Sequence, residues 1–176
     1  MNAASLINYF YNNKIIKLNK KSLINLANLI GSDVILGINP KNTILSSSGK
    51  LTKFKKKLGL HVLIAKPNFG CSTKFIYSKV RCYSKAKYNN PKQLLLSKKN
   101  IVNSSNALEK IAFREYPKLM RIKLFLLKLS KVKFVRMSGS GSSILAYFYS
   151  KKATENARKK FKKEFNNYWC ITSKTI

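Results

Sequence analysis

The sequence predicts an α+β protein whose chain changes character near residue 58. Segments whose apolar residues recur at helical spacing alternate along the chain with short apolar runs that have the length of a strand. The last third of the chain follows the order strand, Gly/Ser loop, strand, helix, strand, which is typical of an α+β domain. A basic run from Lys53 to Lys57, followed by Gly59, separates the two parts. A chain of 176 residues is long enough for one domain, or for one domain and part of another.

The first part, residues 1–58, predicts two helices and a hairpin. The first helix spans residues 3–12, and the second runs from the N-cap Asn19 to Ile30, where Gly31 ends it. Their expected apolar faces comprise Leu6, Ile7 and Phe10 in the first helix and Leu23, Leu26, Ala27 and Ile30 in the second. Strands at 43–45 and 50–54 flank the turn Ser46-Ser47-Ser48-Gly49 and complete the hairpin.

The second part, residues 59–176, predicts a strand at 60–65 that Pro67 ends, and a helix that Ser72 or Thr73 caps. That helix is expected to end near Arg81, and the polar stretch 83–102 is expected to be a loop with one short helix. The remaining expected elements are helices at 104–115 and 117–129, strands at 134–135 and 144–148, a basic helix at 151–165 and a strand at 168–172.

The charge balance favours anionic partners. Lysine and arginine number 36 against 5 aspartates and glutamates, a formal net charge of +31. Such a chain suits phosphorylated small molecules, acidic lipid or nucleic acid. A basic RNA- or ribosome-associated protein is therefore one hypothesis, although the lysines are spread along the chain and form no recognised RNA-binding motif.

Cysteine and histidine usage offers little for metal or disulfide chemistry. Cys71, Cys82 and Cys170 are widely spaced and contain no CxxC pair, so reduced thiols are expected rather than a zinc site or a disulfide framework. His61, the one histidine, lies in an apolar strand-like run and is interpreted as structural. No apolar run approaches the roughly 20 residues of a membrane span, and no basic leader precedes the first helix, so we expect a cytoplasmic protein without a membrane partner.

The run Arg136-Met137-Ser138-Gly139-Ser140-Gly141-Ser142-Ser143 joins two apolar strands and is the most informative stretch of the chain. Alternating glycines permit positive φ and a close approach of another group, and the serine hydroxyls and free amides can bind a phosphate. A flexible hairpin turn is an equally good interpretation, because Gly and Ser dominate turns for steric reasons.

Two further sites are suited to ligand binding. Asp33, the one aspartate, follows a helix end and is either a turn residue or a carboxylate that holds a substrate hydroxyl. The turn from Lys66 to Thr73 joins a strand to a helix and is either a connector or an anion site. Tyr77 lies one helical turn after Thr73 and is either a packing residue or a ring that stacks on a base.

These segments occur together in one known order. Four segments resemble the GHMP kinase superfamily: Asn2-Ala3-Ala4, Gly31-Ser32-Asp33-Val34, Lys66-Pro67 with Ser72-Thr73 and Tyr77, and the run Arg136–Ser142. The segment Asn106-Ala107-Leu108-Glu109, followed by Tyr116-Pro117, is similar to a further family segment. The resemblance covers nearly the whole chain and is strongest to the branch that phosphorylates the 2-hydroxyl of 4-diphosphocytidyl-2-C-methyl-D-erythritol in isoprenoid precursor synthesis. Another small-molecule kinase of the superfamily is the alternative.

The resemblance implies ATP and Mg²⁺ as cofactors. It also implies that residues 1–58 are a remnant of the ATP-binding domain and that residues 59–176 form a ferredoxin-like C-terminal domain. It implies that Asp33 orients the reacting hydroxyl, that Tyr77 stacks on cytosine and that Thr73 is a polar contact beside it. The residues implied to form or support the ATP phosphate loop are Asn2, Ala3, Ser138, Gly139, Ser140, Gly141 and Ser142.

The chain also departs from the family pattern. Met1-Asn2-Ala3-Ala4 resembles only the tail of the family's phosphate loop, and the lysine-bearing strand that precedes this loop in the family is not in the sequence. We therefore expect the sequence to be the C-terminal part of such a kinase, with Met1 either an internal methionine or the start of a truncated gene, and we expect the 176 residues alone to show little or no kinase activity.

Overall fold

The computed structural model describes residues 2–31, 33–38, 41–45, 51–55, 58–82 and 97–175. The described residues up to Lys55 belong to one compact unit, and those from Leu58 to Thr175 belong to a second. Within the described ranges, no helix combines the length and the apolar character that crossing a bilayer requires.

The first unit contains three helices and a two-stranded antiparallel hairpin. Its elements are α1 (Asn2–Asn12), α2 (Lys20–Ile30), α3 (Val34–Ile38), β1 (Asn42–Leu45) and β2 (Leu51–Phe54). The predicted cap of α2 is confirmed, because the Asn19 side chain accepts a hydrogen bond of 2.8 Å from the Ser22 backbone N–H. The helix ends at Gly31, whose N–H donates to the Ala27 carbonyl at 3.2 Å.

The apolar faces of these helices differ from the predicted ones. A small cluster of Ala4, Ile7, Leu23, Ala27 and Val34 is buried, whereas Leu6 is 56% and Ile30 is 52% exposed. Leu6 and Ile30 therefore lie outside the cluster that their predicted faces were expected to form. The strands of the predicted hairpin are confirmed, and its turn, Ser46–Gly49, lies outside the described residues.

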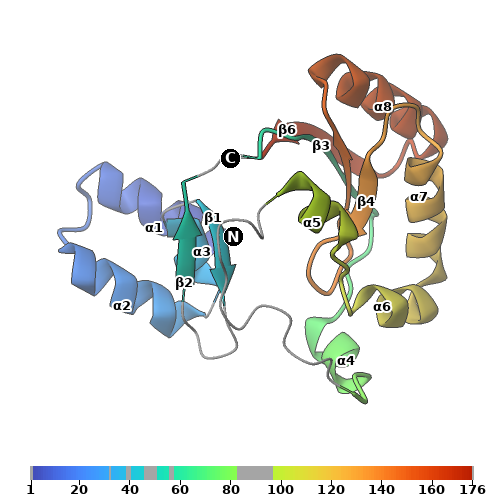
Figure 1. The fold of residues 1–176 in the computed structure, drawn as a ribbon. Helices are drawn as coiled ribbons and strands as arrows, with labels where there is room; N and C mark the ends of the chain where they lie inside the picture. Colours follow the sequence, from blue (N-terminus) through green and yellow to red (C-terminus); the bar gives the residue numbers. More distant parts are fainter. Residues whose placement is uncertain are drawn as a thin grey trace. The chain divides into compact units, whose positions relative to one another are not determined.

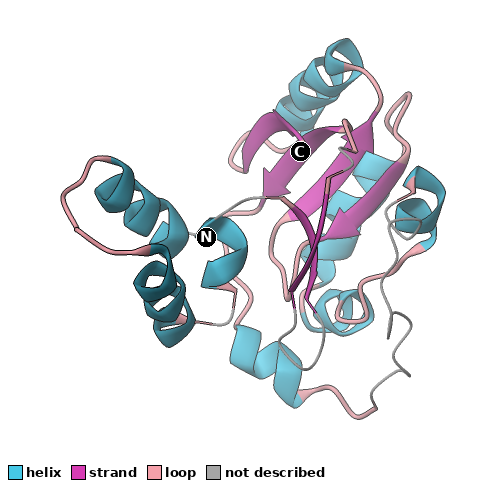
Figure 2. Ribbon diagram, turned by 60° about the vertical axis from the view of Figure 1, so that its left-hand side comes forward, coloured by secondary structure: helices cyan, strands magenta, loops and turns pink. Residues whose placement is uncertain are grey.

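The second unit is built on a four-stranded antiparallel sheet in the order β4-β5-β3-β6 (Figures 1 and 2). Its elements are β3 (His61–Lys66), α4 (Thr73–Ser78), α5 (Lys98–Asn103), α6 (Glu109–Glu115), α7 (Pro117–Leu127), β4 (Phe134–Met137), β5 (Ile144–Phe148), α8 (Lys151–Glu164) and β6 (Trp169–Lys174). The path from β3 through helices to β4 and β5, and then through α8 to β6, is the split β-α-β topology of ferredoxin-like domains. The predicted ferredoxin-like fold is therefore confirmed.

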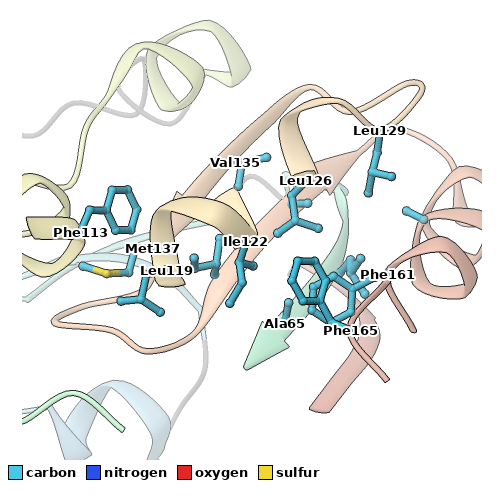
Figure 3. Close-up of a cluster of buried hydrophobic side chains, with 14 of the residues drawn as sticks. Ala65, Phe113, Leu119, Ile122, Leu126, Leu129, Val135, Met137, Phe161 and Phe165 are labelled. Atoms are coloured by element: carbon cyan, nitrogen blue, oxygen red, sulfur yellow. The ribbon is translucent and has the colours of Figure 1, made fainter. Parts of the chain in front are cut away.

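The hydrophobic core of this unit lies between the sheet and the helices α7 and α8 (Figure 3). Leu119, Ile122 and Leu126 repeat at helical spacing along α7, and none of them is accessible to solvent. Phe161 of α8 is likewise fully buried, and its ring contacts Phe125 edge to face at 6.2 Å. Each such side chain contributes about 1.5–3 kcal/mol by leaving water, which makes this layer the main source of stability for the sheet.

Three predicted helix ends differ in the structure. The helix after Thr73 ends at Ser78 instead of Arg81, because the Lys79 N–H bonds the Ile76 carbonyl and closes the last turn. The helix predicted at 104–115 begins only at Glu109. Asn106 accounts for this difference, since its Oδ1 accepts a hydrogen bond of 2.9 Å from the Leu108 N–H and stabilises a turn in place of a helical start. The helix predicted at 117–129 ends at Leu127.

A polar contact joins α8 to the edge strand β6. The Thr172 hydroxyl donates a hydrogen bond of 2.6 Å to Glu155 Oε1, and Arg158 Nε lies 3.1 Å from Glu155 Oε2. The hydrogen bond from Thr172 and that from Arg158 lower the pKa of the Glu155 carboxyl below its ordinary value. Because the folded protein favours the ionised carboxylate, this contact stabilises the fold above the unfolded pKa and is lost as the pH falls.

We predict that Thr172→Val lowers stability at neutral pH, since valine keeps the strand geometry and cannot donate to Glu155. The free energies of unfolding of the two proteins should converge only as the pH falls through the folded-state pKa of Glu155, which lies below the roughly 4.3 of an unperturbed glutamate. Urea unfolding from about pH 2 to about pH 7 measures this effect. A constant difference across that range would contradict the role of Glu155. The matched control is Thr52→Val in β2, a strand threonine of the other unit.

Candidate active site

The candidate site is centred on the Gly-Ser loop, residues 138–143, between β4 and β5. The Ser138 N–H donates to the Ser143 carbonyl, and the Gly141 N–H donates to the Ser138 carbonyl, both at 2.9 Å. Gly139 has φ +54° and Gly141 has φ +94°, which disfavour residues with a side chain. A Cβ at Gly141 would also lie only 3.1 Å from both Cys71 Sγ and Met137 Sδ. The glycine at 141 is therefore required by both backbone and packing.

The turn between β3 and α4 is attached to this loop. Ser142 Oγ donates a hydrogen bond of 2.8 Å to the Phe69 carbonyl, and Thr73 Oγ1 lies 2.9 Å from Ser140 Oγ. The Phe69 ring in turn stacks on Tyr116 with ring centroids 6.0 Å apart. The β3–α4 turn and the Gly-Ser loop are remote in sequence and were predicted as separate sites, yet these contacts join them into one structure.

The segment before α6 holds the loop from its other side. Asn106 Nδ2 donates to the carbonyl oxygens of Met137 and Gly139, at 3.0 and 2.7 Å. Glu109 Oε1 accepts a hydrogen bond of 2.6 Å from the Met137 N–H. These side chains bind backbone groups on either side of Ser138 and so fix the path of the chain into the loop.

An ion pair holds Glu109 in place. Its second oxygen, Oε2, lies 2.5 Å from Lys123 Nζ on α7, and the two side chains are only 15% and 21% exposed. The same ammonium lies 5.4 Å from the centre of the Phe113 ring. A largely buried carboxylate needs such a partner, so Lys123 stabilises the charge that positions the loop.

Arg136 and Cys71 border the loop and have structural roles. The Arg136 guanidinium donates to the backbone carbonyls of Ser104 and Val102, the latter at 3.3 Å, and lies over the Phe134 ring at 5.0 Å. Cys71 is half-buried under Gly141, and burial raises the pKa of its thiol. Arg136 therefore fixes the segment after α5, and Cys71 is a neutral packing group.

The structure brings together Thr73 and the loop residues Ser138, Gly139, Ser140, Gly141 and Ser142. Tyr77 lies on the same short helix as Thr73, with 54% of its side chain exposed. The other sequence-predicted residues belong to the first unit. There Asn2 begins α1, Ala3 packs against the small apolar cluster, and the exposed Asp33 directly precedes α3.

The acidic residues divide into two groups. All four glutamates of the chain form ion pairs in the described structure: Glu109 with Lys123, Glu115 with Arg114, Glu155 with Arg158 and Glu164 with Arg121. Asp33 forms none with any described residue. Among the described residues there is also no group of three or more His, Cys, Asp or Glu side chains that could hold a metal ion.

Sequence reasoning gave no role to the pair Glu109–Lys123, although Glu109 lies in one of the recognised segments. The sequence feature that could have indicated an ion-pair role for Glu109 is the scarcity of acidic residues. With 5 Asp and Glu against 36 Lys and Arg, each carboxylate is a rare partner for a cation. Nothing in the spacing of Glu109 and Lys123 identifies them as partners, since they lie on different helices.

The fold and this loop define a class of protein. Residues 92–167 match the family model described as GHMP kinases C terminal. Residues 92–167 are therefore similar to the C-terminal domain of the GHMP kinases, in agreement with the resemblance found in the sequence.

Among individual proteins, the chain is 57% identical over all its 176 residues to 4-diphosphocytidyl-2-C-methyl-D-erythritol kinase of Pelagibacter ubique, of which it covers 63%. It is 31% identical over 156 residues, 84% of the chain, to the protein of the same name from Petrotoga mobilis, of which it covers 60%. The chain thus spans a little under two thirds of the length of these curated relatives.

The fold has solved counterparts. A crystal structure of 4-(cytidine 5'-diphospho)-2C-methyl-D-erythritol kinase superposes with a TM-score of 0.73 at 20% identity, over 97% of this chain and 62% of that one. Homoserine kinase from Cytophaga hutchinsonii superposes with a TM-score of 0.59 at 19% identity, over 97% of this chain and 61% of that one. At these identities the likeness shows the fold alone.

We predict that Glu109→Gln destabilises the protein by about 1–3 kcal/mol, because it leaves the largely buried Lys123 ammonium without its counter-charge. Amide hydrogen exchange at Met137 should become faster in the variant, since its N–H loses a charged acceptor. Urea unfolding and exchange measured by NMR give both quantities.

Glu115→Gln is the matched control, because it removes the same charge from a pair whose arginine is 65% exposed. It should cost less than about 1 kcal/mol and leave Met137 exchange unchanged. Equal effects of the two substitutions would show that the Glu109–Lys123 pair does not hold the loop.

Proposed function

We propose that this chain is part of an ATP-dependent kinase that phosphorylates the 2-hydroxyl of 4-diphosphocytidyl-2-C-methyl-D-erythritol. The observation that carries the proposal is the Gly-Ser loop, fixed by side chains from two other segments. The names of the curated relatives give the substrate, and their similarity extends over 100% and 84% of the chain.

The loop is suited to bind or support a phosphate. Asn106 and Glu109 engage backbone groups of Met137 and Gly139, and no described residue accepts a hydrogen bond from the N–H of Gly139 or Ser140. Backbone N–H groups held in this way can donate to an anion without a cost of reorganisation. We assign Ser138, Gly139, Ser140, Gly141 and Ser142 to the ATP phosphates, together with Asn2 and Ala3 at the start of α1.

Asp33 has the role of orienting the reacting hydroxyl. Phosphoryl transfer requires positioning and charge neutralisation, and a carboxylate can accept the hydroxyl proton. Among the described acids, Asp33 alone is free of an ion pair, and it is exposed at the start of α3. Mg²⁺ would neutralise charge on the phosphates, and Asp33 is the carboxylate of this chain that could approach it.

Tyr77 and Thr73 are assigned to the cytidine part of the substrate. The Tyr77 ring is 54% exposed on α4, and an exposed ring loses water favourably when a base stacks on it. Thr73 stands one turn earlier on the same helix, and its hydroxyl lies 2.9 Å from Ser140 Oγ. This contact links the proposed cytidine residues to the proposed phosphate loop.

We predict a large loss of turnover for Asp33→Asn in a chimaera in which this chain replaces the matching part of the Pelagibacter ubique protein. The amide cannot accept the hydroxyl proton, so kcat should fall by about 10²–10⁴-fold. Formation of ADP from MgATP and 4-diphosphocytidyl-2-C-methyl-D-erythritol measures it, and Glu164→Gln, a surface acid paired with Arg121, is the control. A chimaera without turnover would contradict the proposed function, and full activity of Asp33→Asn would contradict only the role of Asp33.

We predict that Tyr77→Leu weakens the binding of cytidine 5'-diphosphate by about 5–100-fold, the loss of one base stacked on an aromatic ring. Tyr77→Phe keeps the ring and should bind as the unmodified chain does. Isothermal titration calorimetry measures the dissociation constants. The control is Tyr149→Leu, which removes a tyrosine of the same unit that is 53% exposed. An unchanged affinity in Tyr77→Leu would remove the tyrosine from the site.

A further inference from the structure

The second unit carries an apolar groove whose lining includes neither a residue of the Gly-Ser loop nor Thr73, Tyr77, Asn106 or Glu109. It has a volume of about 740 Å³ and is formed by α6, α7 and the end of α8. Its apolar lining comprises Phe113, Pro117, Met120, Leu124, Phe125 and Phe165. Phe113 and Phe165 are only 7% and 8% exposed, whereas Met120 and Leu124 are 41% and 51% exposed. The groove thus has a recessed aromatic floor and open aliphatic walls.

These exposed side chains are not needed for the core. Leu119, Ile122 and Leu126, on another side of α7, pack against the sheet and are fully buried. Met120, Leu124 and Leu127 follow one another at intervals of four and three residues and form a second apolar stripe along α7, with Leu127 44% exposed. A helix that is apolar on two sides has a second surface to cover, and contiguous exposed apolar side chains commonly mark an interaction site.

The rim of the groove is strongly basic. Lys110, Arg114, Arg121 and Lys128 line it. Arg121 is paired with Glu164 at 3.1 Å and Arg114 with Glu115 at 2.8 Å, whereas Lys110 and Lys128 form no ion pair with a described residue. An occupant must therefore bring acidic groups to the rim and apolar groups to the floor. We propose that the groove binds an acidic amphipathic helix of a partner protein, with its apolar side chains between α6, α7 and the end of α8.

Charge and shape argue against two other occupants. A second copy of this chain would bring a further +31 charges to a basic rim, which is unfavourable. A bilayer surface would contact the protruding Met120 and Leu124 and would leave the recessed rings of Phe113 and Phe165 uncovered. Side chains at positions i, i+3 or i+4 and i+7 of a helix can reach such a floor, as in other helix-in-groove complexes.

The test uses a fluorescein-labelled synthetic peptide of about 18 residues, long enough to form a helix. The probe is rich in Glu and Ala and carries one stripe of leucines at helical spacing. The control peptide has the same composition with its leucines dispersed around the helix. Fluorescence anisotropy should show that the striped peptide binds the chain at least about tenfold more tightly, a difference of about 1.4 kcal/mol.

Variants locate the binding surface. Leu124→Glu should weaken the binding of the striped peptide by at least about tenfold, since it places a charge on the apolar wall and repels the acidic probe. Leu29→Glu makes the same change at a leucine of the other unit that is 86% exposed, and should have no effect. Lys128→Glu should weaken binding, whereas Lys160→Glu on α8, outside this groove, should not. All four positions are exposed, and thermal unfolding by circular dichroism verifies the fold of each variant.

Several results would overturn the proposal. Equal binding of the two peptides would show attraction by charge alone, and an unchanged affinity in Leu124→Glu would place the peptide elsewhere. Sedimentation that shows self-association sensitive to Leu124→Glu, without peptide binding, would make a second copy the occupant. Binding to phosphatidylglycerol vesicles that is sensitive to the same substitution, again without peptide binding, would make the groove a lipid surface.

Discussion

The conformation of the Gly-Ser loop depends on one largely buried carboxylate, that of Glu109. Glu109 accepts the Met137 N–H with one oxygen and binds the Lys123 ammonium with the other, and so connects α6, α7 and β4. A glycine-rich loop has high conformational freedom, and its order must come from outside the loop. Glu109 and Asn106 on one side, and Phe69 and Thr73 on the other, supply that order.

The same reasoning explains how a chain with 36 basic residues uses its 5 acidic ones. Each glutamate compensates a particular cation: the Glu109 pair is largely buried, the Glu155 pair lies within α8, and the pairs of Glu115 and Glu164 lie nearer the surface. The Glu155 carboxylate also accepts the hydrogen bond from Thr172 that joins α8 to β6. Asp33 has no such partner among the described residues. In a chain with this excess of positive charge, a carboxylate that pairs with no described cation supports the role proposed for it.

Helix caps and strand alternation are local features, and the sequence predicted them well. Asn19 and Ser72 cap the helices that follow them, and Pro117 begins α7. The predictions failed where a distant contact decided the outcome. The Asn106 side chain holds the carbonyls of Met137 and Gly139, so the chain at 104–108 turns and the helix starts only at Glu109. Leu6 is exposed because the helix contact in its unit passes through Ala4 and Ile7.

The sequence by itself determined the α+β class, the order of the elements apart from the unpredicted helix α3, and the residues that resemble a GHMP kinase, because propensity, capping and motif order are written along the chain. Only the tertiary structure decided that Phe69, Thr73, Asn106 and Glu109 meet at the Gly-Ser loop, and that Lys123 neutralises Glu109. These contacts join residues 14 to 73 positions apart. Their partners are chosen by the packing of α6, α7 and the sheet, which no local pattern encodes.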